Sequence, residues 1–402
     1  MTASAVTDVA ADGLASPRLG EFILKVASRC NLDCTYCYVY NKGDSTWKRQ
    51  PKIMARPVFD AALNRIAHHC DQTGQSRVVL VFHGGEPCLI GVDRFREFCE
   101  AALQTLGTRA NVALAIQTNG TLLSSDWAKA FRDYRVEVGV SMDGPKVLHD
   151  QHRITKSGRG SYEAVRRGVA TLSEHDVPFH ILAVIPLGHE PLPIHRHFLS
   201  LGCESIAYLL PAYTWDSVGP VREEHGPTPC ADFLIPVFDD WWFNGTLDVR
   251  VREFWSMARL VLGGTSTVDA FGNHPMPFLT IETDGEVHGL DKLRICQDGL
   301  TGTGMTVLES DFSQIINAAG SPNAEVLAGT TLPDGCRACP ERETCGGGYL
   351  PHRYSRSRGF NNPSVWCADL LALFTHVRKR LGVSHAETAA RRGELVALEG
   401  NA

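Results

Sequence analysis

The stretch Cys30-Asn31-Leu32-Asp33-Cys34-Thr35-Tyr36-Cys37 directly follows the apolar, β-branched run from Phe22 to Ala27. Such a run predicts a buried strand, so the cysteines lie on the loop that leaves its carboxyl end. Three thiolates on one short loop can converge on an iron–sulfur cluster, and they leave one iron of a cubane without a protein ligand. A structural zinc site usually needs a fourth ligand, and none is obvious nearby. We therefore interpret Cys30, Cys34 and Cys37 as cluster ligands.

The same kind of apolar run recurs along the first half of the chain, with amphipathic stretches between the runs. The predicted strands are Phe22 to Ala27, Val78 to Phe82, Val112 to Gln117, Val136 to Ser141, Phe179 to Ile185 and Ser205 to Leu210. The predicted helices are Val58 to Gln72, Val92 to Leu106, Ser125 to Tyr134, Tyr162 to His175 and Leu192 to Leu201. This alternation predicts an α/β fold with consecutive parallel βα units, which fit a partial (β/α)6 barrel over residues 21–210.

The rest of the chain divides into segments with other patterns. Residues 1–20 predict a disordered tail, and residues 211–277 form a bridge region with aromatic-rich helices. Phe278 to Leu290 predicts a hairpin that turns at Thr283-Asp284-Gly285. This hairpin opens a C-terminal lobe over residues 278–383, whose last helix begins near Cys367. Residues 384–402 are a charged tail that is either helical or disordered.

Composition and charge exclude several classes of function. The 402 residues are 44% hydrophobic and 21% charged, as in an ordinary globular protein. A formal net charge of −6 offers no general attraction to nucleic acid or to an anionic membrane. No secretory signal and no apolar stretch of spanning length is present, so we expect a cytoplasmic protein without nucleic-acid or membrane partners. Thirteen cysteines in a reducing compartment direct attention to metal or cluster ligation.

Small and polar residues follow three more of the predicted strands. The segments are His83-Gly84-Gly85-Glu86-Pro87, Gln117-Thr118-Asn119-Gly120 and Ser141-Met142-Asp143-Gly144-Pro145. Glycine lets a backbone approach a ligand closely, although the first segment taken alone is also an ordinary turn. In α/β barrels the loops at the carboxyl ends of the strands carry the chemistry, which makes these segments candidate ligand contacts.

These features together resemble the radical S-adenosylmethionine (radical SAM) superfamily. Its signature has two cysteines separated by three residues and a third after two more, preceded by an aromatic residue, which is Tyr36 here. The resemblance implies a 4Fe-4S cluster held by the three cysteines, whose open iron chelates the amino and carboxylate groups of S-adenosylmethionine. It also implies one-electron reductive cleavage to a 5′-deoxyadenosyl radical.

The resemblance also assigns cofactor contacts to the loops after the strands. Gly84, Gly85 and Glu86 match the family's motif for the cofactor amine, while Ser141 and Asp143 match contacts to the methionyl carboxylate and the ribose. The full set of expected cofactor-binding residues is Tyr36, Gly84, Gly85, Glu86, Thr118, Asn119, Ser141, Asp143, Arg153 and Val184.

Two members of this set rest on less. Arg153 would pair with the cofactor carboxylate, but a surface ion pair is an equal alternative, and Arg159 is a rival in the same connection. Val184 would contact the adenine through backbone atoms, because it ends the fifth predicted strand.

A second cysteine group lies in the C-terminal lobe. Its members are Cys336, Cys339, Cys345 and Cys367, with three glycines directly after Cys345. The spacing alone fits a zinc knuckle as well as a cluster. With the hairpin and the Cys-Gly-Gly-Gly run, however, the region resembles the SPASM extension of radical SAM enzymes, which implies an auxiliary 4Fe-4S cluster on these four thiolates.

The chain departs from the usual SPASM pattern at two positions. Tyr349 and Leu290 stand where that pattern has cysteines, so we expect one auxiliary cluster and not two. Cys296 is either a leftover ligand or a buried thiol. Asp291 follows Leu290, one of the two positions without the expected cysteine, and is the predicted proton acceptor. The alternative is that Asp291 is only an exposed carboxylate of the hairpin.

The sequence around Cys345-Gly-Gly-Gly-Tyr-Leu-Pro-His-Arg-Tyr resembles the FxsB-type peptide maturases. That group implies a ribosomal precursor peptide as substrate and a carbon–carbon crosslink between an aromatic ring and a β-carbon, a cyclophane. The alternatives are an anaerobic sulfatase-type maturase that forms formylglycine and, in another class, a noncatalytic iron–sulfur or zinc protein that binds peptides. Expected partners are the peptide and a flavodoxin-like or ferredoxin-like electron donor. Because the residues before Glu21 are too few for a recognition domain, we expect leader binding to use either the body of the chain or a separate leader-binding protein.

Overall fold

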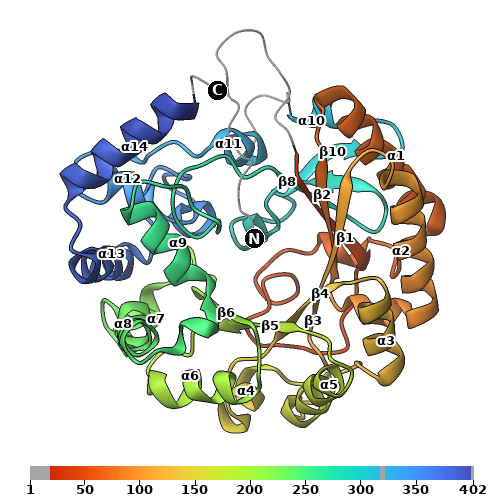
Figure 1. Cartoon of the computed structure of the whole chain (residues 1–402), viewed down its shortest axis with the longest axis horizontal. Coiled ribbons are helices and arrows are strands. Elements are labelled where there is room, and N and C mark those ends of the chain that lie inside the picture. Colours follow the sequence, from red (N-terminus) through yellow and green to blue (C-terminus); the bar gives the residue numbers. More distant parts are fainter. Residues whose placement is uncertain (1–18, 317–321, 400–402) are drawn as a thin grey trace.

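An arc of parallel strands, each followed by helical segments, makes up the first half of the protein. The computed structural model describes residues 19–316 and 322–399. The strands are β1 (Glu21–Ala27), β2 (Arg77–Gly84), β3 (Asn111–Thr118), β4 (Glu137–Ser141), β5 (Phe179–Val184) and β6 (Ser205–Leu209). Neighbouring strands pair in parallel throughout, with the helices on the outer side of the arc (Figure 1). The predicted α/β fold with a parallel sheet is confirmed.

The outer helices match the predicted ones to within a few residues. They are α1 (Arg56–Thr73), α2 (Val92–Leu106), α3 (Ser125–Asp133), α5 (Tyr162–Glu174) and α6 (Pro191–Ser200). Two short helices, α4 (Lys146–His152) and α7 (Gly219–His225), have no counterpart among the predicted elements. Both have only seven residues, too few to show an apolar repeat at helical spacing.

Most of the remaining elements occupy the side that the arc leaves open, whereas α10 lies beside α1 (Figure 1). The helices are α8 (Pro229–Phe243), α9 (Arg252–Val261), α10 (Phe312–Ile316), α11 (Pro322–Ala328), α12 (Arg342–Cys345), α13 (Cys367–Leu381) and α14 (His385–Glu399). The strands are β7 (Arg250–Val251), β8 (Phe278–Ile281), β9 (Glu286–His288) and β10 (Gly302–Thr306). The 3-10 helices are η1 (Thr46–Lys48), η2 (Pro87–Ile90), η3 (Thr246–Asp248), η4 (Asp291–Ile295), η5 (Asp334–Cys336) and η6 (Leu350–Arg353).

The C-terminal hairpin belongs to the same sheet as the barrel strands. β8 and β9 pair antiparallel as predicted, and β8 also pairs in parallel with β1, from Glu21 opposite Phe278 to Leu24 opposite Ile281. A single ten-stranded sheet results, in the order β10-β9-β8-β1-β2-β3-β4-β5-β6-β7. The local sequence did not predict this pairing, because a hydrophobic pattern identifies a strand but not its partner far along the chain.

Three of the barrel strands, β2, β3 and β5, bury one face and leave the other partly accessible. Along β2 the side chains of Val78, Leu80 and Phe82 are buried, whereas the alternate residues, including His83, keep partial exposure. β5 shows the same alternation. Because successive side chains on a strand point to opposite faces, the buried set packs under the helices and the other set lines the inside of the arc. The interior of this open barrel is therefore accessible.

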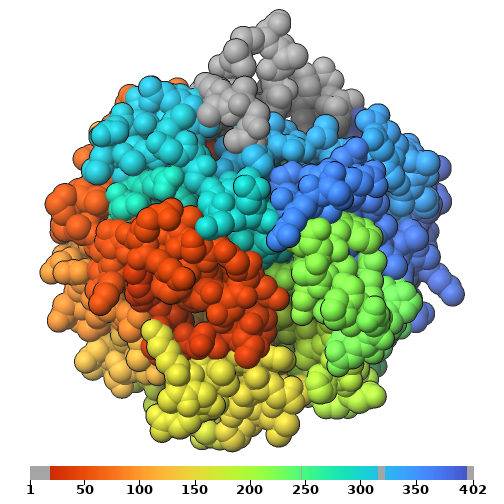
Figure 2. Space-filling view, turned by 180° about the vertical axis from the view of Figure 1, so that it is seen from behind, coloured from red at the N-terminus to blue at the C-terminus, as the bar shows by residue number. Residues whose placement is uncertain are grey.

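The loop after β1 covers one end of the barrel. In Figure 2 this red-orange segment occupies the middle of one face and meets the yellow segment after β4, the green bridge and the blue C-terminal part. Within the described residues, no helix has both the length and the apolar character needed to cross a membrane.

The N-terminal tail prediction lies mostly outside the described residues, but its end can be corrected. Leu19 is fully buried, and its backbone N–H donates a hydrogen bond of 2.9 Å to Nε2 of His69. At the other terminus, the charged Ala-rich segment adopts the helical alternative, as α14.

A buried ionic network joins the hairpin to the barrel. The Arg294 guanidinium on η4 donates hydrogen bonds of 2.5 Å to Asp44, 2.5 Å to Glu282 and 2.6 Å to Asp291. Lys25 of β1 donates a further bond of 2.5 Å to Asp291. Charges taken out of water are stable only when they are paired in this way, so the network fixes these segments relative to one another.

We expect Asp291→Asn to lower stability in a pH-dependent way. Burial raises the pKa of Asp291, but Lys25 and Arg294 lower it well below its ordinary value. A depressed native pKa contributes stability above the unfolded-state pKa of about 3.9 and loses it as the pH falls through the native pKa. Urea unfolding should show a loss of about 3–5 kcal/mol at pH 7, as for a broken buried ion pair. The loss should shrink below about pH 4. An equal loss at every pH would show that the charge of Asp291 is not responsible.

A second prediction concerns the packing of α5 on the loop after β3. A Cβ added at Gly168 of α5 would lie 2.2 Å from the carbonyl oxygen of Gly120, whereas one at Gly393 of α14 would meet nothing within 4 Å. Gly168→Ala should therefore destabilise the protein by about 1–3 kcal/mol through overpacking. Gly393→Ala should be neutral or stabilising, because alanine favours helix. Urea midpoints of the two variants measure this, and equal midpoints would contradict the close approach.

Candidate active site

The three-cysteine loop is held against the segment that follows β4. The N–H of Asp33 donates to the carbonyl of Ile154 at 2.8 Å, and the N–H of Thr35 donates to that of His152 at 3.0 Å. Cys37 closes the loop through its N–H, which donates to the carbonyl of Cys34 at 2.9 Å. The three cysteines are partly exposed. These bonds hold the loop with its three cysteines at the open end of the barrel.

When no metal is bound, burial disfavours the ionised form of these thiols. It raises the pKa of Cys30 to about 12 and that of Cys34 to about 11. Without a metal both thiols would therefore stay protonated near neutral pH. A coordinated metal ion displaces the thiol proton, so binding of a cluster would convert these thiols to thiolates.

Gly84 and Gly85 let the loop after β2 touch the cysteine loop. A Cβ on Gly84 would lie 2.0 Å from the carbonyl oxygen of Ala27, and one on Gly85 would lie 1.9 Å from the hydroxyl of Tyr40. The N–H of Gly85 is already bonded to Ala27, at 2.8 Å. The structure therefore gives these glycines a positioning role toward the cysteine loop, in addition to any contact with a ligand.

Glu86 ties three loops together. Its buried carboxylate accepts hydrogen bonds from the hydroxyl of Thr118 at 2.6 Å and from the N–H of Asn119 at 2.7 Å. Asn119 in turn donates from its amide to Asn31 at 2.8 Å and to the sulfur of Cys30 at 3.7 Å. Burial raises the pKa of Glu86 in spite of these bonds, which lower it. The predicted residues after β2 and β3 therefore converge on the first cysteine.

Asp143 is the centre of the next group of predicted residues. It is buried, and it accepts hydrogen bonds from the Tyr36 hydroxyl, from Nε of Arg153 at 2.9 Å and from the N–H of Val184 at 3.1 Å. Arg153 is also buried, with its guanidinium 5.6 Å from the centre of the Tyr36 ring. The exposed Arg159 takes no part. Arg153 is therefore in a buried ion pair with Asp143 and not in a surface one.

Ser141 lies on the inside of the barrel beside this group. Its hydroxyl accepts a hydrogen bond of 3.0 Å from the Gln117 amide on the neighbouring strand. All ten predicted cofactor residues therefore lie at the same end of the barrel as the three cysteines, on the loops and strand ends that surround them.

Asp291 lies in a setting that does not suit a proton acceptor. Besides Lys25 and Arg294, the Tyr38 hydroxyl donates to it at 2.7 Å. A carboxylate with three donors and a pKa well below its ordinary value is a weak base. It is also buried, so it is not the exposed hairpin carboxylate that was the alternative.

The four C-terminal cysteines line one cavity. Its empty volume is about 340 Å³, and Cys336, Cys339, Cys345 and Cys367 all contribute to its wall. The three glycines after Cys345 have φ values of +62°, +82° and +73°, which favour glycine. In the described part of the chain, no three His, Cys, Asp or Glu side chains converge closely enough to hold a single metal ion. The donor set and the cavity fit a cluster spread over four thiolates.

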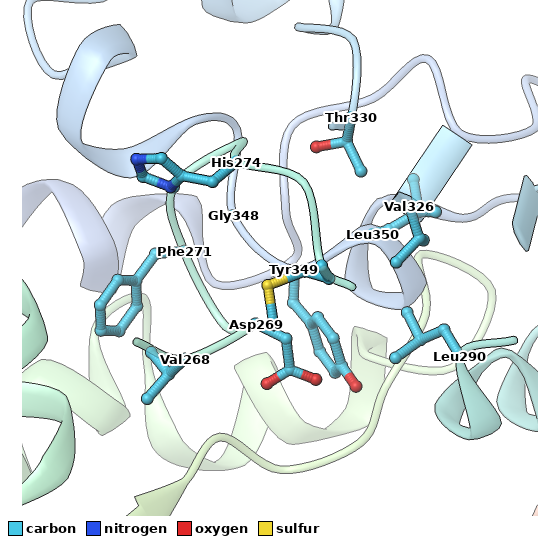
Figure 3. Close-up of a pocket in the computed structure, with 12 residues that line it drawn as sticks. Val268, Asp269, Phe271, His274, Leu290, Val326, Thr330, Gly348, Tyr349 and Leu350 are labelled. Atoms are coloured by element: carbon cyan, nitrogen blue, oxygen red, sulfur yellow. The ribbon is translucent and has the colours of Figure 1, made fainter. Parts of the chain in front are cut away.

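A separate pocket occupies the place of the two missing cysteines. Its empty volume is about 350 Å³, and Tyr349 and Leu290 are in its wall (Figure 3). The Tyr349 hydroxyl and the Asp269 carboxylate point to the same side of it. Burial and a hydrogen bond to Asp269 raise the pKa of Tyr349 well above its ordinary value. This pocket has no thiol in its wall.

The remaining cysteines also have defined places. Cys70, Cys88, Cys99, Cys203 and Cys230 are buried, as expected for core thiols. The thiol of Cys296 donates to the carbonyl of Pro351 at 3.7 Å and lies outside both groups. Sequence reasoning missed Arg353, whose buried guanidinium binds the glycine run after Cys345. The only signal for it in the sequence is a basic residue a few positions after the glycines.

Comparison with known proteins agrees with this geometry. Residues 24–198 match the model of the Radical SAM superfamily. A relative is the cysteine-type anaerobic sulfatase-maturating enzyme of Clostridium novyi, which is 26% identical over 89% of this chain and 94% of its own.

Two solved structures share the fold. The structure described as native anSMEcpe with bound AdoMet and Cp18Cys peptide has a TM-score of 0.76 at 22% identity, over 90% of this chain and 97% of that one. Streptococcus suis SuiB bound to its precursor peptide SuiA has a TM-score of 0.56 at 13% identity, over 87% and 76%. The barrel part of the chain, residues 24–198, matches the Radical SAM superfamily, and the three-cysteine loop and the predicted residues around it all lie within that match.

Proposed function

We propose that this enzyme modifies a side chain of a ribosomally made peptide, and that the modification is a carbon–carbon crosslink between a β-carbon and an aromatic ring. The observation that carries the proposal is the pairing of a three-cysteine loop at an accessible barrel end with four further cysteines around one cavity. The partly exposed inner faces of β2 and β5 would let a peptide side chain approach the cysteine loop.

The cofactors would be held by residues described above. Cys30, Cys34 and Cys37 would bind one 4Fe-4S cluster, and the C-terminal four cysteines would bind the auxiliary one. When bound, the first cluster and S-adenosylmethionine supply a 5′-deoxyadenosyl radical, and the auxiliary cluster supplies an electron acceptor. In the crosslinking reaction, the substrate loses one hydrogen atom to the radical and then a proton and an electron as the new bond forms.

The chain's own residues would orient and enclose the reactants. Glu86 holds Asn119 against the cysteine loop, and Asp143 fixes Arg153, whose remaining guanidinium nitrogens can meet a carboxylate. Holding reacting groups in one geometry is the main contribution that such a site makes to rate. The loop after β1 and the C-terminal part lie around the same end of the barrel and would limit access of water there (Figure 2).

A second candidate function is formylglycine formation on a serine or cysteine. It is favoured by the relative from Clostridium novyi, which is a sulfatase-maturating enzyme and aligns over 89% of this chain. Against it stands the pocket that contains Tyr349 and Leu290, where a second auxiliary cluster has no thiol ligands. The FxsB-like run after Cys345 favours the crosslink. A flavodoxin-like or ferredoxin-like donor and a separate leader-binding protein complete the proposal.

The iron content should separate the two cysteine groups. Anaerobic reconstitution should give about eight irons per chain, as two cubanes of four. Cys34→Ala and Cys345→Ala should each reduce this to about four. Cys34→Ala should also abolish 5′-deoxyadenosine formation after addition of reductant and S-adenosylmethionine. Cys296→Ala is the matched control and should keep all the iron. Bound zinc in place of iron, with no cofactor cleavage, would leave the noncatalytic metal-protein alternative.

The product should decide between the two modifications. The enzyme would be incubated with any short peptide found to be encoded beside its gene and, separately, with a peptide that carries a sulfatase active-site cysteine. A crosslink removes two hydrogens and gives a peptide that resists fragmentation inside the ring. Formylglycine reacts with hydrazines, so a hydrazine-reactive product from the sulfatase peptide, with no crosslink in the precursor, would overturn the first proposal in favour of the second.

A further inference from the structure

Arg353 is a buried arginine without a carboxylate partner. Only 1% of its surface is exposed, yet its guanidinium donates hydrogen bonds to oxygen atoms that carry no formal charge. The acceptors are the carbonyls of Gly346 at 2.6 Å, Gly347 at 3.1 Å, Gly348 at 2.8 Å and Thr331 at 2.8 Å, and the hydroxyl of Thr330 at 3.1 Å. Among the described residues, no carboxylate takes part in these bonds. A buried charge of this kind is costly unless an anion compensates it.

The arginine and the glycines after Cys345 have complementary shapes. All three glycines have positive φ, which turns their carbonyls toward one guanidinium. A Cβ at Gly347 would lie 3.1 Å from Cζ of Arg353, so the loop can enclose the guanidinium only without side chains there. The planar fork of arginine suits several acceptors at fixed positions, which a lysine ammonium could not all reach. The loop that carries Cys345 is therefore built around Arg353.

The anion that is missing from this arrangement can be identified by its position. Gly347 lines the four-cysteine cavity, and its carbonyl accepts a hydrogen bond of 3.1 Å from Arg353, which places the guanidinium directly behind the cavity wall. Burial lowers the pKa of Arg353, whereas the thiols of Cys345 and Cys336 and the carboxylate of Glu325 raise it. The two thiols belong to the four that line the cavity of about 340 Å³. As cluster ligands they are thiolates, and a cubane with four thiolates carries net negative charge.

We propose that Arg353 is the positioning residue and the electrostatic counter-charge of the auxiliary cluster held by Cys336, Cys339, Cys345 and Cys367. The proposal rests on the auxiliary cluster of the proposed function. Reduction adds an electron to an already anionic cluster, and a nearby buried cation stabilises the reduced state more than the oxidised one. Arg353 thereby raises the reduction potential of the cluster and makes it a better acceptor of the electron that leaves the substrate.

The test uses the full chain with Cys30, Cys34 and Cys37 all changed to Ala, so that only the auxiliary cluster remains. This parent is reconstituted without oxygen with ferrous iron and sulfide, and should hold about four irons. Its midpoint potential is measured by dithionite titration followed by electron paramagnetic resonance. In this background, Arg353→Met should shift the potential to more negative values, while Arg353→Lys, which keeps the charge, should shift it less.

Arg342→Met is the matched control. Arg342 lines the same cavity and carries the same charge, but its side chain is 48% exposed and pairs with Glu343 at 3.2 Å. Water and Glu343 screen its charge, so its removal should leave the potential close to that of the parent. A potential in Arg353→Met equal to that of the parent would overturn the proposal, and so would an equal shift in Arg342→Met.

Iron content distinguishes the remaining outcomes. One outcome is that Arg353→Met folds with the circular dichroism of the parent and still binds no iron. In that case the iron content of Arg353→Lys decides. A bound cluster in Arg353→Lys supports the counter-charge, and the absence of iron overturns it. A parent that itself holds no iron would instead overturn the auxiliary cluster of the proposed function, before Arg353 is changed.

Discussion

The buried ion pairs of Arg294 are the constraint on which the rest of the structure depends. One guanidinium joins Asp44 from the loop after β1, Glu282 from the hairpin turn and Asp291 from η4. Lys25 on the innermost strand completes the network. These charges are stable away from water only as a set, so the loop, the hairpin and the barrel must take up one relative arrangement. The parallel pairing of β8 with β1 adds a continuous backbone ladder to that constraint.

This constraint decides where the two cysteine groups lie. Asp44 and Tyr38 belong to the segment that also carries Cys30, Cys34 and Cys37, and both are bonded to the network. The hairpin and η4 precede the lobe with the other four cysteines. The network thus connects the segment after β1, which carries the first cysteine group, to the hairpin and η4, which precede the second group. The network also explains the low pKa of Asp291. This carboxylate holds the Lys25 and Arg294 side chains in place and is poorly suited to accept a proton.

Two kinds of polar group surround the candidate cofactor sites. Around the three-cysteine loop, carboxylates of Glu86 and Asp143 are satisfied by backbone N–H groups and side-chain donors, which orients the loops without leaving a free charge. Around the four-cysteine cavity, all the hydrogen bonds that Arg353 donates within the described residues go to uncharged oxygens, so its charge has no directly bonded counter-ion. The first arrangement positions groups, whereas the second also sets an electrostatic potential.

The local sequence determined the strands and long helices of the barrel, the hairpin, the cysteine groups and the loops around the first group. It could do so because hydrophobic period and ligand spacing are properties of contiguous residues. Only the tertiary structure decided that β8 extends the barrel sheet, that Arg153 rather than Arg159 meets Asp143, that Asp291 is bound by two cations, and that Arg353 supports the glycine loop. Each of these four findings depends on contacts between residues far apart in the chain or on the burial of a charged group. A local sequence pattern specifies neither long-range contacts nor burial of this kind.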